Sequence, residues 1–187
     1  MGNQSELYKI FALFDDSTIR VYQAFKDAIA SEAVQKGTFG AHFKLGRMTW
    51  IKPSFLWMMY RSGWATKEGQ TRILAMDIKR AGFELIVKSA VASSYSEEIY
   101  GTHENWKELL AKSGARSQWD PDRDIHGAPQ ERRAIQLGIK GEFVRQYVYE
   151  WIVKITDITQ YIVDMRTAII TKTFGERMLP IEREFLF

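Results

Sequence analysis

The chain has 187 residues, of which 45% are hydrophobic and 13% aromatic, and this supports one well-packed domain over residues 1–187. It contains no cysteine, which excludes a disulfide framework, thiolate metal ligands and a cysteine nucleophile. Its net charge of +3 is compatible with a nucleotide or nucleic-acid ligand but does not by itself indicate one.

The first residues, Met1 to Glu6, lack the basic and apolar regions of a signal peptide. No apolar run approaches the ~20 residues that span a bilayer. Together with the absence of cysteine, these features predict a cytoplasmic protein.

Hydrophobic periodicity predicts a chain that mixes strands and helices. Residues 7–14 are apolar and fit either a strand or a helix. In chain order, the first half is predicted to contain a strand over 19–25, a helix over 26–36, a strand over 48–51, a helix over 53–62, a strand over 72–80 and a helix over 81–92. The second half is predicted to contain a loop over 93–102, a helix over 103–112, a turn-rich loop over 114–130, a strand over 132–140, a helix over 141–149, a strand over 151–156 and a helix up to 170.

The stretch from Met48 to Trp64 is the centre of the chain, since three tryptophans and three methionines fall within it. Pro53 is predicted to begin its helix and Gly63 to end it. Because this helix is apolar on nearly all sides, we expect it to be buried. Arg61 is the exception, and a buried guanidinium needs a carboxylate, a phosphate or a cavity.

These elements favour an α+β fold of a single domain. We expect a curved, mostly antiparallel, split sheet of five to six strands, with helices packed around the central apolar helix over 53–62. A doubly wound parallel sheet is less consistent with the amphipathic strands. The glycine-rich dinucleotide motif and the P-loop are both absent.

The junction between the central strand and helix is the first candidate ligand site. Lys52 and Ser54 flank the predicted first helical turn, where free N–H groups and the helix dipole attract anions. The alternative is a solvated lysine, with Arg61 paired to a carboxylate of the core. On the strand over 19–25, Arg20 could hold a phosphate and Tyr22 could stack on a base, or both could belong to an ordinary surface strand.

Two further patterns leave alternatives open. Asp120, Asp122, Asp124 and Glu131 have the spacing of a calcium loop, but Ile125 stands where the glycine is required, so we expect an ordered loop and no metal. The carboxylates of that loop would pair with Arg123, Arg132 or Arg61. Gln136 lies between Ala134 and Gly138 on one strand face, and these small neighbours leave space either for a ligand or for another packed element.

Five segments carry a resemblance to a known family. They are Arg20 to Ala24, Met48 to Gly69, Gln118 to Asp124, Ile135 to Gly138 and Glu150 to Ile152. Over most of residues 18–165 the chain resembles the microbial family known as domain of unknown function 4291, which implies no established activity.

The strand Arg20-Val21-Tyr22 also resembles the first core strand of the ADP-ribosyltransferase superfamily. These enzymes are small α+β domains with a split antiparallel sheet that break the glycosidic bond of NAD through an oxocarbenium-like state, which a glutamate stabilises. The Glu/Gln-X-Glu motif of a late strand is absent here. The catalytic group is therefore unassigned, with Glu142, Glu150 and Gln136 as candidates.

The resemblance implies a nucleotide-binding enzyme that uses NAD and no metal. Arg20 and Arg61 would hold phosphates, Tyr22 and Trp50 would stack, and Gln136 would position the acceptor or the ribose. The remaining candidate ligand-binding residues are Lys52, Ser54, Trp119 and Arg123. Two alternatives come from other classes: a non-catalytic nucleic-acid-binding module, and a protein-interaction or dimerisation domain that uses the aromatic stretch. The oligomeric state is left open.

Overall fold

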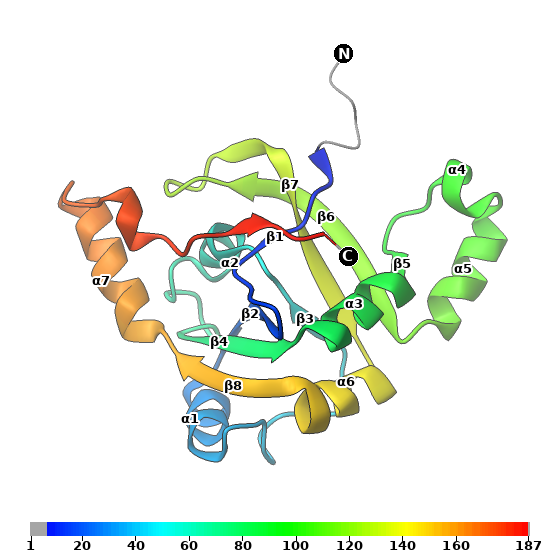
Figure 1. The fold of residues 1–187 in the computed structure, drawn as a ribbon, viewed down its shortest axis with the longest axis horizontal. Coiled ribbons are helices and arrows are strands. Elements are labelled where there is room, and N and C mark those ends of the chain that lie inside the picture. Colours follow the sequence, from blue (N-terminus) through cyan, green and yellow to red (C-terminus); the bar gives the residue numbers. More distant parts are fainter. Residues whose placement is uncertain (1–6, 187) are drawn as a thin grey trace.

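Antiparallel pairing dominates the described part of the chain, residues 7–186 of the computed structural model (Figure 1). A three-stranded sheet has the order β2 (Thr18–Phe25), β4 (Arg72–Lys79), β8 (Ile152–Asp157). A four-stranded sheet has the order β3 (Thr49–Ile51), β7 (Pro129–Ile139), β6 (Ala115–Arg123), β5 (Ala90–Ala92). A two-stranded sheet pairs β1 (Phe11–Ala12) with β9 (Arg183–Glu184). Of the pairs in residues 7–186, β5 with β6 is the parallel one.

The two larger sheets meet where β2 passes β3. Their connection is an isolated bridge in which the Tyr22 amide donates to the Lys52 carbonyl oxygen at 2.7 Å. The predicted α+β fold with a split, mostly antiparallel sheet is therefore confirmed. The strand number was underestimated, because residues 7–186 hold nine strands and four of these have only two or three residues.

Seven α-helices surround the sheets in residues 7–186. They are α1 (Asp27–Lys36), α2 (Phe55–Ser62), α3 (Arg80–Ser89), α4 (Glu97–Tyr100), α5 (His103–Lys112), α6 (Glu142–Gln146) and α7 (Thr159–Ile170). A π-helical turn (Tyr147–Trp151) follows α6, and a 3-10 turn (Glu176–Met178) follows α7. Figure 1 shows α7 at one side of the molecule, and α4 and α5 projecting from the other.

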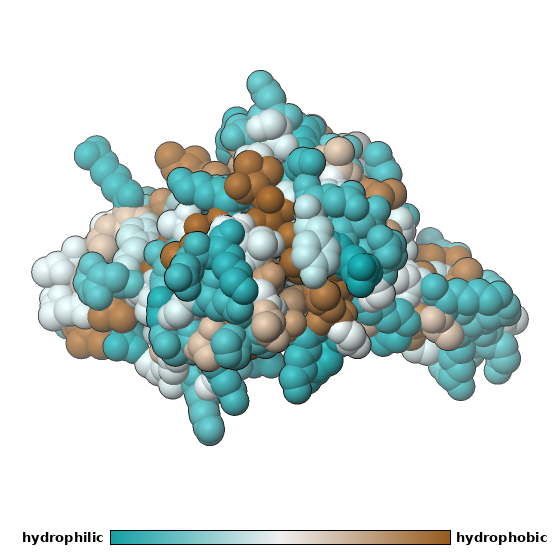
Figure 2. All heavy atoms as spheres, turned by 90° about the horizontal axis from the view of Figure 1, so that it is seen from below, coloured by the Kyte–Doolittle hydropathy of each residue, from teal (hydrophilic) through white to brown (hydrophobic). Residues whose placement is uncertain are grey.

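The core has two parts, one on each face of the β2–β4–β8 sheet. The larger part lies between the two sheets and includes Val21, Met76 and Leu137, covered by α1 and α3. The smaller part lies under α2 and α7 and includes Tyr22 and Met59. Seen from below, hydrophobic side chains also reach the surface along the middle of one face, flanked by hydrophilic ones (Figure 2).

Helix α2 has the predicted end but a different beginning. Ser54 is the N-cap, and its Oγ accepts a hydrogen bond from the Trp57 amide at 3.3 Å, so the helix begins at Phe55 rather than at Pro53. It ends at Gly63, whose φ of 58° is left-handed. Most of α2 is buried, as predicted.

The prediction that Arg61 is buried was wrong. Arg61 and Tyr60 are exposed, since they lie on the one side of α2 that does not face the core. The buried cation of this stretch is Lys52, which is only 8% exposed. Burial of most of α2 also leaves little of its aromatic surface free for an interface.

The predicted loop over 114–130 is mostly strand. Residues 115–123 form β6, which pairs along its length with β7, and a register shift near Pro121 accommodates the proline. The turn is confined to residues 124–128, where the Asp124 carboxylate accepts from the His126 and Ala128 amides. The turn-forming residues of this segment indicated a loop, but pairing with β7 holds residues 115–123 in an extended strand.

Other boundaries differ by smaller amounts. Residues 90–92 form a strand and 97–100 a short helix, where a helix end and a loop were expected. Among residues 7–186, no helix combines the length and the hydrophobicity required to span a bilayer. The segment for which we predicted no signal peptide, residues 1–6, lies outside the described residues.

Candidate functional site

A small pocket lies at the split between the two sheets, beneath the exposed end of α2. We call it the inner pocket; its volume is about 200 Å³. It is lined by Gln23, Ala24 and Phe25 from β2, by Met48, Thr49, Trp50 and Lys52 around β3, and by Met58, Arg61 and Gln70. Three predicted site residues, Trp50, Lys52 and Arg61, are therefore brought together here.

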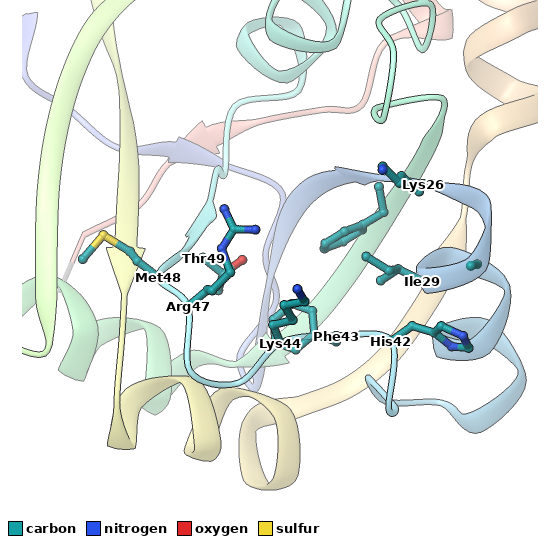
Figure 3. A pocket seen from close by; sticks show the side chains of 10 residues that line it. Lys26, Ile29, His42, Phe43, Lys44, Arg47, Met48 and Thr49 are labelled. Carbon is teal, nitrogen blue, oxygen red and sulfur yellow. The ribbon is translucent and has the colours of Figure 1, made fainter.

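A larger pocket, the outer pocket, continues from the inner one, since both are lined by Phe25, Met48 and Thr49. Its volume is about 440 Å³, within the usual range of small-molecule sites. Apolar side chains that include Phe25 and Phe43 line it. Figure 3 shows Lys26, Lys44 and Arg47 placed around it, from the start of α1 and the loop before β3. We refer to the two pockets together as the cleft.

The cleft is strongly basic. Lys26, Lys44 and Arg47 line the outer pocket and Lys52 and Arg61 the inner one, and no carboxylate of the described residues lines either. Within residues 7–186, none of these five side chains forms an ion pair with an acid. Cations that the protein leaves unneutralised around an aromatic surface are suited to an anionic ligand that carries a ring.

Lys52 is the most perturbed cation of the cleft. Its Nζ donates to the Trp50 carbonyl oxygen at 3.1 Å and lies 6.0 Å from the centre of the Trp57 ring. Burial, and next the charge of Arg61, lower its pKa from 10.5 to about 7, while the charge of Asp120 opposes the shift. The predicted anion site at the strand-to-helix junction thus contains an amine that is partly neutral at physiological pH.

Asp120 lies on β6 in a network of amides. It accepts from Gln118 Nε2 at 3.0 Å and from Gln136 Nε2 at 2.7 Å. Its negative charge acts on Lys52 and raises the pKa of that amine. The space predicted beside Gln136 is occupied: the Trp50 ring lies over Gly138, where an added Cβ would come within 2.9 Å of it. Packing of another element, the alternative we had left open, is what the structure shows.

Arg20 and Tyr22 do not reach the cleft. The Arg20 guanidinium pairs with Asp77 on the adjacent strand through Nε–Oδ1 at 2.7 Å and Nη2–Oδ2 at 2.9 Å. Tyr22 is buried under Phe55 of α2, and burial raises the pKa of its phenol well above the usual range. Its hydroxyl makes no hydrogen bond with the described residues. Both residues line a separate small pocket near Tyr161.

Ser54 makes structural hydrogen bonds at the start of α2 and does not line the cleft. Its Oγ donates to Asp122 at 3.0 Å, and the buried Asp122 also binds Arg132, with an Nη2–Oδ2 distance of 2.6 Å. The expected pairing of the acidic segment with Arg132 is therefore present. Glu182 completes this end of α2 by accepting from the Phe55 amide at 2.7 Å.

The other predicted residues are dispersed. Arg123 lies 4.0 Å from the centre of the Tyr60 ring, and Trp119 packs edge-on against Tyr8, both away from the cleft. Glu142 and Glu150 are exposed near α6, and neither lines the cleft.

Sequence reasoning missed most of the outer pocket. No motif distinguishes Lys26, Phe43, Lys44 and Arg47, which come from the start of the predicted helix over 26–36 and from the segment between that helix and the strand over 48–51. The one available signal was the basic segment from Lys44 to Arg47, directly before the hydrophobic stretch that begins at Met48.

The fold and the site together define an α+β protein with a split antiparallel sheet and a basic cleft at the split. The chain belongs to the family described as Domain of unknown function (DUF4291), whose model matches residues 9–185. The family resemblance expected from the sequence is confirmed. None of the curated proteins matches the chain.

Proposed function

We propose that the cleft binds a nucleotide, and that the ligand is NAD. The observation that carries this proposal is the arrangement of four cations, the basic side chains of the cleft other than the buried Lys52, around a hydrophobic, aromatic-lined hollow. Within residues 7–186 these four form no ion pair with an acid, and no carboxylate lines the hollow. A nucleotide has the matching parts: a flat base for the outer pocket and phosphates for the cations.

The two pockets differ in a way that orients such a ligand. The outer pocket, at about 440 Å³ and lined by Phe25, Ile29 and Phe43, has room for a base and its ribose. The inner pocket, at about 200 Å³, has room for a smaller group beside Lys52 and Arg61. Arg47 lies in the outer pocket close to where the two join, since the following residues, Met48 and Thr49, line both. A pyrophosphate would lie at that junction.

Transfer of ADP-ribose is the finer proposal, and it rests on the resemblance of Arg20-Val21-Tyr22 together with the split sheet. In that reaction the bond between the ribose C1′ and the nicotinamide nitrogen breaks, nicotinamide keeps the electron pair, and an acceptor nucleophile forms the new bond to C1′. An anionic side chain would stabilise the cationic transition state. No carboxylate among residues 7–186 lines the cleft, so the structure assigns this role neither to the exposed Glu142 and Glu150 nor to Asp120, and the stabilising group is left unassigned.

Calorimetric titration with NAD, ATP and ADP-ribose tests binding. The double variant Lys44→Gln/Arg47→Gln should weaken binding by roughly 100- to 10,000-fold, because each of the two charge-assisted bonds to a phosphate contributes about 1.5–3 kcal/mol. The matched control, Lys107→Gln/Lys172→Gln, removes the same charge from exposed positions outside the cleft and should bind as the wild type does. Equal weakening by both pairs, or no binding by the wild type, would refute a nucleotide site.

Release of nicotinamide from NAD, measured by chromatography, separates the two parts of the proposal. If NAD binds but no nicotinamide is released, the protein binds a nucleotide and the proposed transferase activity is refuted.

The nucleic-acid alternative relies on the same cations. It predicts that the logarithm of the affinity for a single-stranded oligonucleotide falls with the logarithm of the salt concentration, with a slope of about 0.7 per phosphate contacted. Tight NAD binding with no oligonucleotide binding would exclude the nucleic-acid alternative.

A further inference from the structure

Lys52 has an environment that is unusual for a lysine. It is 8% exposed, and its Nζ has one hydrogen-bond partner in the described residues, the Trp50 carbonyl oxygen at 3.1 Å. No carboxylate of residues 7–186 lies within ion-pairing distance of it. The nearest acid with a charge effect on Lys52, Asp120, already accepts from two glutamine amides.

Such a site favours the neutral amine. An ammonium ion loses its hydration on burial, and only a paired anion compensates that loss. The charged groups that act on Lys52 are Arg61 from α2, which disfavours a second positive charge, and Asp120 from β6, which favours it. Burial and Arg61 prevail, and the pKa of Lys52 falls to about 7. The neutral amine that burial favours carries a free lone pair on Nζ.

The amine also faces a place where a ligand can lie. Lys52 and Arg61 line the same inner pocket, and Arg61 has no protein carboxylate to neutralise it among residues 7–186. A ligand anion held by Arg61 would bring its neighbouring carbon atoms to Nζ. A desolvated lysine next to a second cation is an arrangement that activates amines for attack on carbonyl carbon.

We propose that Lys52 is a nucleophilic lysine that condenses with the carbonyl group of an anionic aldehyde or open-chain sugar to form an imine. The inference uses the cleft of the proposed function but does not require that the cleft bind NAD. The open-chain form of ADP-ribose, which carries an aldehyde and a pyrophosphate, belongs to the proposed ligand class.

The step balances without an oxidant or a reductant. The Nζ lone pair forms a bond to the carbonyl carbon, and a proton moves from nitrogen to the oxygen to give a carbinolamine. The hydroxyl group then takes a proton from solvent and leaves as water while the nitrogen lone pair forms the C=N bond, and the second N–H proton returns to solvent. One amine and one carbonyl give one imine and one water.

Pyridoxal 5′-phosphate is a suitable probe, because it combines an aldehyde with a phosphate. The wild-type protein is incubated with a stoichiometric amount at pH 7.5, the imine is reduced with borohydride, and peptides are analysed by mass spectrometry. We expect the label at Lys52 at least 10-fold above any exposed lysine, and a labelling rate that rises with pH to a midpoint near 7. Labelling spread over the exposed lysines, or absent at Lys52, would overturn the proposal.

Three variants and one analogue complete the test. Lys52→Met should abolish the specific label and Lys107→Met should retain it, with circular dichroism confirming that both fold. Arg61→Gln, or pyridoxal without its phosphate, should reduce labelling of Lys52 by roughly 10-fold, because the anion is no longer held. Undiminished labelling in these two cases would refute the role of Arg61. Labelling of Lys52 in a protein that fails to bind NAD would retain this inference and reject the proposed function.

Discussion

The buried Lys52 should lower the free energy of unfolding relative to an uncharged side chain of similar size, and replacement by methionine tests this. Methionine has a similar length and no charge to desolvate. In the folded chain the pKa of Lys52 is about 7, against 10.5 for an exposed lysine. Above pH 10.5 both states are neutral and the amine contributes nothing through its charge. As the pH falls towards 7, the unfolded chain binds the proton and the folded chain does not, so folding loses free energy.

The size of this loss follows from the two pKa values. A fall from 10.5 to about 7, at about 1.4 kcal/mol per pKa unit, sets an upper limit of about 5 kcal/mol, reached near pH 7 and constant below it. The variant also loses the hydrogen bond from Nζ to Trp50, which is worth about 1 kcal/mol. We therefore expect Lys52→Met to be more stable by ~1–4 kcal/mol at pH 7 and no more stable than wild type above pH 10.5.

Urea unfolding at pH 7 and pH 10, followed by tryptophan fluorescence, measures the difference. The control is Lys107→Met, since Lys107 is exposed on α5 and its replacement should change the free energy of unfolding by less than about 0.5 kcal/mol at both pH values. A variant that is less stable at pH 7, or a difference from wild type that is the same at both pH values, would show that Lys52 is charged and solvated in the folded protein.

Three other substitutions probe the surroundings of the cleft. Glu182→Gln keeps an acceptor for the Phe55 amide and removes a carboxyl group whose pKa burial raises from 4.5 to about 8. Because the unfolded chain ionises first, wild-type stability falls as the pH rises from 4.5 to 8, so the variant should be more stable by ~1–3 kcal/mol at pH 8 and equal below pH 4.5 in urea titrations. Gly138→Ala places a Cβ about 2.9 Å from the Trp50 ring and should cost ~1–3 kcal/mol, so an unchanged melting temperature would contradict that contact. Asp122→Ala removes a 1%-exposed carboxylate that binds Ser54 and Arg132, and should destabilise by ~3–5 kcal/mol, whereas a loss below about 1 kcal/mol would mean that water replaces the carboxylate.

The fold was largely predictable because its elements have strong local signals. Residues 19–25 alternate along both faces of a strand, and Gly63 ends α2 in the left-handed conformation. Strand β6 was missed because its polar and proline residues oppose strand formation locally, and the long pairing with β7 overrides them.

The site was predictable only in part, for a related reason. Lys52 and Arg61 were identified as charges in a hydrophobic stretch, but which of the two is buried depends on how β3 and α2 pack in the tertiary fold. Arg20 was interpreted as a ligand residue because its partner, Asp77, is 57 residues away in the sequence and the pairing depends on strand register. Long-range pairing of this kind leaves no local signal.

The bridge between Tyr22 and Lys52 has a mechanical consequence. Each large sheet is held by a ladder of backbone hydrogen bonds, whereas one backbone hydrogen bond connects the two sheets within residues 7–186. The two sheets are therefore held against each other mainly by the core packed between them and by the Gln23 side chain, which donates to the Thr49 hydroxyl and the Trp50 carbonyl oxygen across the split. The carbonyl group of the single backbone bond belongs to Lys52, so the residue that presents the buried amine also ties the two sheets together.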